Sequence, residues 1–210
     1  MKKKSVARAP KTAAATTDAG AALLDAARDI FFEEGVRGLS VRRVAEKAGC
    51  TTMAVYSRFN GKEGILGALF DEGFEKLSLA QRDIDPRLEN EERLLAFCHA
   101  YRDTAHRYPH HYALMMGDFS GTLQPSLDSQ AKALATLDSL TSAVKSMPQM
   151  TTKNRLASAE IANRLFAFCH GWVSLERVRF FGAEQNADTQ FDQAITALLA
   201  ANPQLKRSLG

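Results

Sequence analysis

Apolar residues recur along the chain at intervals of three and four, the spacing that places side chains on one face of an α-helix. Leu23, Ala27 and Ile30 show this spacing near the N-terminus, and Phe191 and Ile195 show it near the C-terminus. No segment of the sequence alternates apolar and polar residues over the length of a strand. The pattern therefore predicts an all-α fold of about nine helices.

Capping and helix-breaking residues divide the first third of the chain into short helices. The expected N-terminal caps are Asp18, Ser40 and Thr51. Helix ends are expected at Gly35, Gly38, Gly49, Asn60 and Gly61. A fourth helix is expected to begin at Lys62 and to end before Asp85 and Pro86. The longest predicted helix spans residues 153–181, and the last spans residues 188–201.

Charge is unevenly distributed along the chain. Residues 1–62 carry 12 Lys or Arg and 6 Asp or Glu, whereas the rest of the chain carries 15 and 18. A basic N-terminal part followed by a slightly acidic remainder indicates a segment that binds a polyanion. Residues 1–17 lack apolar periodicity, so we expect them to form a mobile basic arm. A purely solubilising role is the alternative for this arm.

The composition argues against several classes of protein. No run approaches the ~20 apolar residues of a membrane span, and no apolar run follows the basic start as in a secretory signal. The cysteines are odd in number, widely separated and without a CxxC pair, which argues against a disulfide framework or a structural zinc site. We therefore expect a cytoplasmic protein of a reducing compartment, with no membrane partner and no cofactor.

The histidines are the main candidates for catalytic chemistry. His99, His106, His110 and His111 lie close together in the sequence. Their spacing matches no metal-site or nucleophile template, and the chain has no glycine-rich phosphate loop. We therefore expect that the protein is not an enzyme.

Two of the predicted short helices are joined by a three-residue turn. This turn consists of Ala48, Gly49 and Cys50, in which Gly49 permits a tight bend and Cys50 is small enough to pack beneath it. The arrangement is typical of a helix-turn-helix, whose second helix places its N-terminal residues in the major groove of DNA. Many helical hairpins share this pattern, so the neighbouring residues decide its meaning.

The residues around the turn carry a more specific signal. The motifs are Val44-Ala45-x-x-Ala48-Gly49, Tyr56-x-x-Phe59, Lys62-Glu63 and the earlier Phe31-Phe32-x-x-Gly35. With these motifs, residues 18–75 closely resemble the N-terminal domain of the TetR family of bacterial transcriptional regulators. The resemblance implies a helix-turn-helix DNA-binding domain at 18–64 and a helical ligand-binding and dimerisation domain at 65–210.

The resemblance also implies a set of DNA-contacting residues. They are Ser40, Arg42, Arg43, Thr51, Thr52, Met53, Tyr56, Ser57, Arg58 and Lys62. Tyr56 and Lys62 are expected to bind phosphates, and the basic arm is expected to reach an adjacent minor groove. Ala54 departs from the threonine that the family often has, and Arg43 departs from an acidic residue. The alternatives are that Tyr56 is a packed aromatic residue and that Arg42 and Arg43 form a solvated face.

For the C-terminal part, the resemblance implies a homodimer formed by helices 153–181 and 188–201. The alternative is that the apolar face of the last helix packs on its own chain. Residues 165–176 are similar to the W-H-G stretch of one TetR C-terminal subgroup. His170 occupies the matching position, and Phe166 stands where the tryptophan is expected.

In this family the C-terminal helices surround a ligand pocket. The candidate pocket residues are Phe70, Phe74, Phe97, Tyr101, Met115, Met116, Phe119, Phe166, His170 and Trp172. Aromatic and methionine side chains suit a small apolar or planar ligand. Core packing is the alternative for each of them, and for His170 the alternative is a hydrogen-bonded core histidine.

These expectations combine into one hypothesis. The chain is predicted to be a sequence-specific transcriptional regulator, namely a ligand-responsive repressor that binds a palindromic double-stranded DNA operator as a homodimer. The alternative is an architectural or division-linked DNA-binding protein that has no small-molecule inducer.

Overall fold

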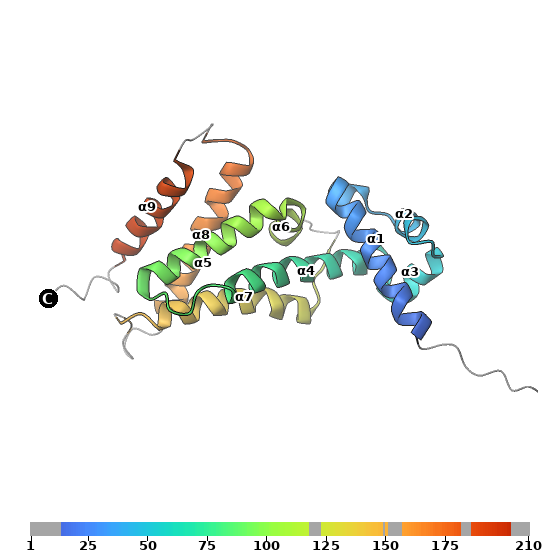
Figure 1. The fold of residues 1–210 in the computed structure, drawn as a ribbon, viewed down its shortest axis with the longest axis horizontal. Coiled ribbons are helices and arrows are strands. Elements are labelled where there is room, and N and C mark those ends of the chain that lie inside the picture. Colours follow the sequence, from blue (N-terminus) through green and yellow to red (C-terminus); the bar gives the residue numbers. More distant parts are fainter. Residues whose placement is uncertain (1–13, 118–122, 149, 151–156, 182–185, 203–210) are drawn as a thin grey trace, which may run out of the picture. The chain divides into compact units, whose positions relative to one another are not determined.

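The computed structural model describes residues 14–117, 123–148, 150, 157–181 and 186–202. Within these residues the chain forms nine helices and no strand, which confirms the all-α prediction (Figure 1). The helices are α1 (Ala14–Gly38), α2 (Val41–Lys47), α3 (Thr52–Phe59), α4 (Lys62–Arg82), α5 (Asn90–Arg107), α6 (Pro109–Met116), α7 (Leu127–Lys145), α8 (Ala157–Arg177) and α9 (Ala187–Ala200).

The chain divides into two compact units, and the division falls within α4 after Leu69. In the first unit, α1 packs against α2 and α3, and α2 packs against α3. The core of this unit is built from side chains such as Leu23, Phe31, Val44 and Val55, all of which are almost completely buried. Each of these side chains stabilises the fold by roughly 1.5–3 kcal/mol relative to an exposed position. The short helices α2 and α3 are therefore held by tertiary packing more than by their own propensity.

The first helix differs from its prediction at its start. It begins at Ala14, so Asp18 lies inside α1 and the predicted cap at this position is wrong. The predicted arm of residues 1–17 overlaps the first turn of α1, and residues 1–13 lie outside the described part of the chain. At the other end, Gly35 has non-helical dihedral angles and α1 ends at Gly38, as the glycines predicted.

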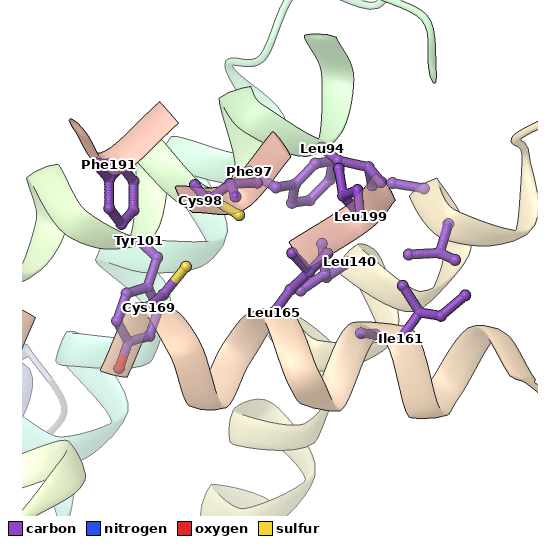
Figure 2. Close-up of a cluster of buried hydrophobic side chains, with 14 of the residues drawn as sticks. Leu94, Phe97, Cys98, Tyr101, Leu140, Ile161, Leu165, Cys169, Phe191 and Leu199 are labelled. Carbon is purple, nitrogen blue, oxygen red and sulfur yellow. The ribbon is translucent and has the colours of Figure 1, made fainter. Parts of the chain in front are cut away.

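The second unit contains the rest of α4 and helices α5 to α9. Its core lies where α5, α7 and α8 pack against one another, and α9 packs against α5 and α8 (Figure 1). Figure 2 shows part of this core, including Leu94 and Phe97 of α5, Leu165 of α8 and Leu199 of α9. The buried side chains Phe191 and Ile195 of α9 follow the helical spacing seen in the sequence.

The last two helices differ from the prediction, α8 in its length and α9 in where its apolar face packs. Helix α8 ends at Arg177, so the prediction of a helix to residue 181 runs too far, and residues 153–156 lie outside the described part. The apolar residues Phe191, Ile195 and Leu199 of α9 are buried against their own chain. This is the alternative stated for that face, so these three side chains are not available to a partner.

Among the helices of the described residues, none combines the length and apolar character needed to cross a membrane.

Candidate nucleic-acid interface and internal cavities

Two side-chain caps define the helices around the turn. The Ser40 hydroxyl accepts a hydrogen bond from the Arg43 backbone N–H at 3.2 Å, and the Thr51 hydroxyl accepts one from the Ala54 N–H at 3.2 Å. Both caps were predicted, and both are confirmed. Helix α3 ends at Asn60, which adopts a left-handed conformation with φ of 56°. The caps and this end confine α3 to eight residues.

The turn between α2 and α3 has the geometry that its glycine predicts. Gly49 has a φ of 64°, a conformation that residues with a Cβ rarely adopt. The Cys50 backbone N–H donates to the Ala45 carbonyl at 2.9 Å, and the Cys50 thiol lies 3.5 Å from the Ala48 carbonyl oxygen. Helices α2 and α3 therefore form a helix-turn-helix.

Helix α3 has one buried side and one exposed side. Val55 is completely buried, whereas Met53 is 74% exposed and Tyr56 is 56% exposed. The other predicted contacts on this helix are also exposed, namely Thr51, Thr52, Ser57 and Arg58. Phe59, which was expected in the core, is only half-buried. The exposed side therefore presents short polar groups, a flexible thioether and a phenol to solvent.

The ring of Tyr56 lies close to Gly61, just after α3. A Cβ built on Gly61 would approach the Cε1 atom of Tyr56 to 3.1 Å. The Tyr56 ring can occupy this position because Gly61 has no side chain to clash with it. Tyr56 is thus positioned by its neighbour while its exposed fraction stays above one half.

Arg43 is bound within the chain. Its guanidinium donates to both carboxylate oxygens of Glu34 in α1, at 2.7 and 2.5 Å, and to the Gly38 carbonyl at 2.8 Å. The hydrogen bonds from Arg43 lower the pKa of Glu34 from its usual value. The arginine that departs from the family pattern therefore links α2 to α1. Arg42, next to it, is exposed.

Lys62 is also held within the chain, at the first position of α4. Its ammonium group donates to the Val36 carbonyl at 3.2 Å, and the residue is half-buried. A phosphate contact by Lys62 therefore requires this hydrogen bond to be exchanged. The start of α4 also passes very close to the end of α3, because a Cβ on Gly64 would lie 1.6 Å from the Phe59 carbonyl oxygen.

The predicted pocket residues fall into separate places in the second unit. Phe97, Tyr101 and Phe166 line one cavity of about 20 Å³, and Tyr101 and Met115 line another of about 10 Å³. A cavity of this size holds about one water molecule, so neither has room for an organic ligand in this conformation. The three predicted residues of the larger cavity come from α5 and α8.

The other candidates do not line these cavities. Phe70 and Phe74 are buried and pack with ring centroids 5.0 Å apart. Trp172 packs against Phe181 and Phe191, and Met116 lies at the edge of the core. Phe119 lies outside the described residues.

His170 adopts the alternative stated for it. Its Nδ1 atom lies 2.8 Å from the Tyr112 hydroxyl and 3.4 Å from the Tyr101 hydroxyl. Burial raises the pKa of Tyr101 far above its usual value, and the nearby Tyr112 adds to this shift. The Tyr101 phenol is therefore neutral, and His170 belongs to a hydrogen-bonded network between α5, α6 and α8.

A buried arginine joins the last helices, and the sequence analysis missed it. Arg102 of α5 bonds to Glu176 of α8 at 2.8 Å and to Asp188 of α9 at 2.6 Å. The Trp172 indole N–H and the His106 ring also bond to Glu176, at 2.9 and 2.7 Å. Burial on its own would raise the pKa of Glu176, but the hydrogen bonds from Arg102, His106 and Trp172 outweigh it, so the pKa is lowered.

Gln81 is a second residue that the sequence analysis missed. It lines the cavity of about 20 Å³ from α4, one helical turn after the buried Leu77. A signal was present in the sequence, because a polar residue four positions after a core leucine lies on the same inward face.

The comparisons with known proteins agree with this geometry. A family model described as bacterial regulatory proteins, tetR family, matches residues 23–69. A model described as tetracyclin repressor-like, C-terminal domain, matches residues 94–198. The similarity of residues 165–176 to the W-H-G stretch stays a prediction.

Individual relatives are also similar to this chain. The HTH-type transcriptional regulator SrpR of Pseudomonas putida is 36% identical over 98 residues, which cover 47% of this chain and 45% of that protein. The match thus spans less than half the length of this relative. The relative is named as a regulator, in agreement with the prediction that the chain is not an enzyme.

Solved structures establish the fold. The putative regulatory protein SCO4313 superposes with a TM-score of 0.73 at 20% identity, covering 91% of this chain and 100% of that one. A TetR variant from Acinetobacter baumannii AYE, in complex with minocycline, superposes with a TM-score of 0.61 at 16% identity, covering 89% and 97%.

Proposed function

The chain belongs to the TetR family of bacterial regulatory proteins, and from this premise we propose that it is a ligand-responsive repressor that binds a palindromic DNA operator as a homodimer. The proposed domains are a basic arm at 1–17, the DNA-binding domain at 18–64 and the ligand-binding and dimerisation domain at 65–210. The proposed location is the cytoplasm. The comparisons do not favour an architectural protein without an inducer.

One observation carries the proposal, namely the exposed side of α3. Met53 and Tyr56 are mostly exposed on a helix whose opposite side is fixed by the buried Val55. A rigid helix that projects from a tight turn fits the major groove of DNA. Threonine and methionine side chains contact thymine methyl groups, and a tyrosine hydroxyl donates to a phosphate.

The phosphate contacts are proposed to come from Tyr56, Arg42, Arg58 and Lys62, together with the arm. Arg43 is a weaker candidate because Glu34 already compensates its charge. Thr51 and Ser40 cap their helices, so each lies at a helix N-terminus, where free backbone N–H groups favour an anion.

A short recognition helix reads few base pairs, so affinity requires two copies of it. Half-sites about 34 Å apart, one turn of DNA, suit a symmetric dimer. The dimer is proposed to use the outward sides of α8 and α9, since the inward side of α9 is buried in its own chain. Leu175 in the last turn of α8, and Val178 and Phe180 just after it, support this proposal because they are exposed apolar residues.

The ligand is proposed to bind in the second unit. One solved structure of this fold holds minocycline, which supports a ligand site among these helices. Helix α4 carries Lys62 at its first residue and Phe70 and Phe74 further along it. A ligand that prefers one conformation of this helix shifts the protein toward or away from the state that binds DNA.

The test is a selection of bound duplexes from a random DNA pool with the full chain, followed by sequencing. The expected result is an inverted repeat whose half-sites are separated by about one helical turn. Sedimentation of the complex should give two chains per duplex. A pool that shows no enrichment, or a single chain bound to one half-site, would refute the proposal.

A further inference from the structure

The cavity of about 20 Å³ that Phe97, Tyr101 and Phe166 line lies at the meeting point of four helices of the second unit. Its wall includes Leu77 and Gln81 of α4, Tyr101 of α5, Leu140 of α7 and Phe166 of α8. Most of the wall is fully buried, but Gln81, Leu137 and Phe166 are half-buried. These three residues therefore mark the side on which the cavity is nearest to solvent.

One wall atom is a buried hydrogen-bond acceptor without a partner. The side-chain N–H of Gln81 donates to the Thr136 carbonyl at 3.1 Å. Because a carbonyl oxygen only accepts, this bond settles which end of the amide faces Thr136. The amide oxygen, Oε1, is buried and has no hydrogen-bond partner within the described residues.

The rest of the wall is uncharged. Leucine, phenylalanine and threonine side chains make up much of it, and the two thiols Cys98 and Cys169 complete it beside Tyr101 (Figure 2). The contact with Cys169 and burial raise the pKa of Cys98, so its thiol stays neutral. The Tyr101 hydroxyl already faces His170 at 3.4 Å. The cavity wall thus contains neutral groups and one unsatisfied acceptor.

We infer that this cavity is the ligand site and that it takes a neutral aromatic molecule with one hydroxyl or N–H group, which donates a hydrogen bond to Gln81 Oε1. The inference rests on the proposed function, because it names the ligand class of that regulator. An apolar wall with a small number of placed polar groups is typical of small-molecule sites. A charged ligand is disfavoured because no wall residue compensates a charge.

The site must open before such a ligand enters. A volume of about 20 Å³ holds one water molecule, whereas an aromatic ring needs several times more. Leu137 and Phe166 are half-buried, so fewer neighbouring atoms oppose an outward movement of their side chains than for the buried residues of the wall. Ligand binding therefore selects an opened conformation of the bundle, which is the change that a regulator requires.

The experiment measures binding of three probes to the full chain by titration calorimetry. Phenol carries a donor, toluene has nearly the same shape without one, and benzoate carries a charge. We expect phenol to bind at least tenfold more tightly than toluene, and benzoate not to bind. In Gln81→Met, phenol binding should fall by about tenfold while toluene binding is retained. Gln130→Met, at an exposed position of α7, is the matched control and should leave the affinities for phenol and toluene unchanged.

The probe series on the unmodified chain decides the question even if Gln81→Met fails to fold. Equal affinities for phenol and toluene, binding of benzoate, or no binding of any probe would overturn the inference. A gel shift on the selected operator, with and without phenol, separates this inference from the proposed function. Phenol binding without release of DNA would leave the ligand class standing and refute ligand-responsive repression. Operator binding with no phenol binding would refute only the ligand class.

Discussion

The guanidinium of Arg43 in α2 donates two hydrogen bonds to the carboxylate of Glu34 in α1, at 2.7 and 2.5 Å. Both arginines are exposed, but no carboxylate of the described residues pairs with the adjacent Arg42. The two neighbouring arginines therefore differ in how much of their charge is available to a polyanion.

This difference predicts opposite results for two matched variants. Arg42→Gln should reduce the slope of log affinity for operator against log salt concentration by about one, since one phosphate contact is lost. Arg43→Gln should leave the slope nearly unchanged, because Glu34 already compensates that charge. Glu34→Gln should steepen the slope by about one, because it frees Arg43. Fluorescence-anisotropy titrations at several salt concentrations measure these slopes. If Arg43→Gln reduced the slope more than Arg42→Gln, the conclusion that Arg42 carries the charge available to DNA would be contradicted.

Tyr56 and Lys62 supply the second prediction. Tyr56→Phe removes one hydroxyl and should weaken operator binding by about ten- to a hundredfold, because a hydrogen bond to a charged group contributes roughly 1.5–3 kcal/mol. Lys62→Ala should weaken binding and lower the salt slope by about one. Lys145→Ala, at an exposed position of α7, is the control for general charge and should have little effect. Unchanged binding in both test variants, measured by gel shift, would remove these residues from the interface.

Two glycines of α4 give a matched pair for stability. A Cβ at Gly64 would lie 1.6 Å from the Phe59 carbonyl oxygen, whereas a Cβ at Gly67 meets nothing within 4 Å. Gly64→Ala should therefore destabilise the protein by about 2 kcal/mol or more, because backbone must shift to make room. Gly67→Ala should be neutral or stabilise by up to about 1 kcal/mol, since alanine favours a helix interior. Urea unfolding of both variants makes the comparison, and equal midpoints would show that α3 and α4 are not packed this closely.

Local features of the first unit could be predicted well from the sequence. The caps at Ser40 and Thr51 and the turn at Gly49 depend on residues within three or four positions of each other. Such short-range interactions leave a direct signature in the order of residue types. The prediction at Asp18 was wrong because alanine and threonine before it also continue a helix, and α1 starts at Ala14.

Long-range pairings left no comparable signature. Arg102 meets Glu176 across 74 positions, and Gln81 meets Thr136 across 55. The periodicity places each residue on the inward side of its helix, but it does not say which polar group lies opposite. The same holds for Arg43, because its partner Glu34 lies on another helix. The sequence therefore predicted Arg43 as a DNA contact and did not reveal this ion pair.

The buried Arg102 is expected to hold α9 onto the bundle. Its side chain is 9% exposed, that of Glu176 is 12% exposed, and that of Asp188 is 82% exposed. Arg102→Met should cost about 3 kcal/mol, because it leaves the Glu176 carboxylate buried without its main partner. Asp188→Asn should cost much less than Arg102→Met, since this side of the network is open to water. Denaturant melts give both values. If Asp188→Asn lowered the free energy of unfolding more than Arg102→Met, the exposed Arg102–Asp188 pair would be the more stabilising part of the network.

The same network predicts how stability depends on pH. The folded protein lowers the pKa of Glu176, whereas the unfolded chain leaves it near the ordinary value of about 4.3. The stabilisation is therefore fully present above that pH, and it is lost as the pH falls through the lower folded value. Glu176→Gln, which has no charge to lose, should have a lower melting temperature than the unmodified chain at pH 7. The gap should shrink below about pH 4 and nearly close once the carboxylate is protonated. Thermal melts of the two proteins at pH 7, 5, 4 and 3 measure it, with Glu160→Gln at an exposed position of α8 as the control. A gap that stays constant down to pH 3 would mean that the charge of Glu176 contributes nothing and that only its shape matters.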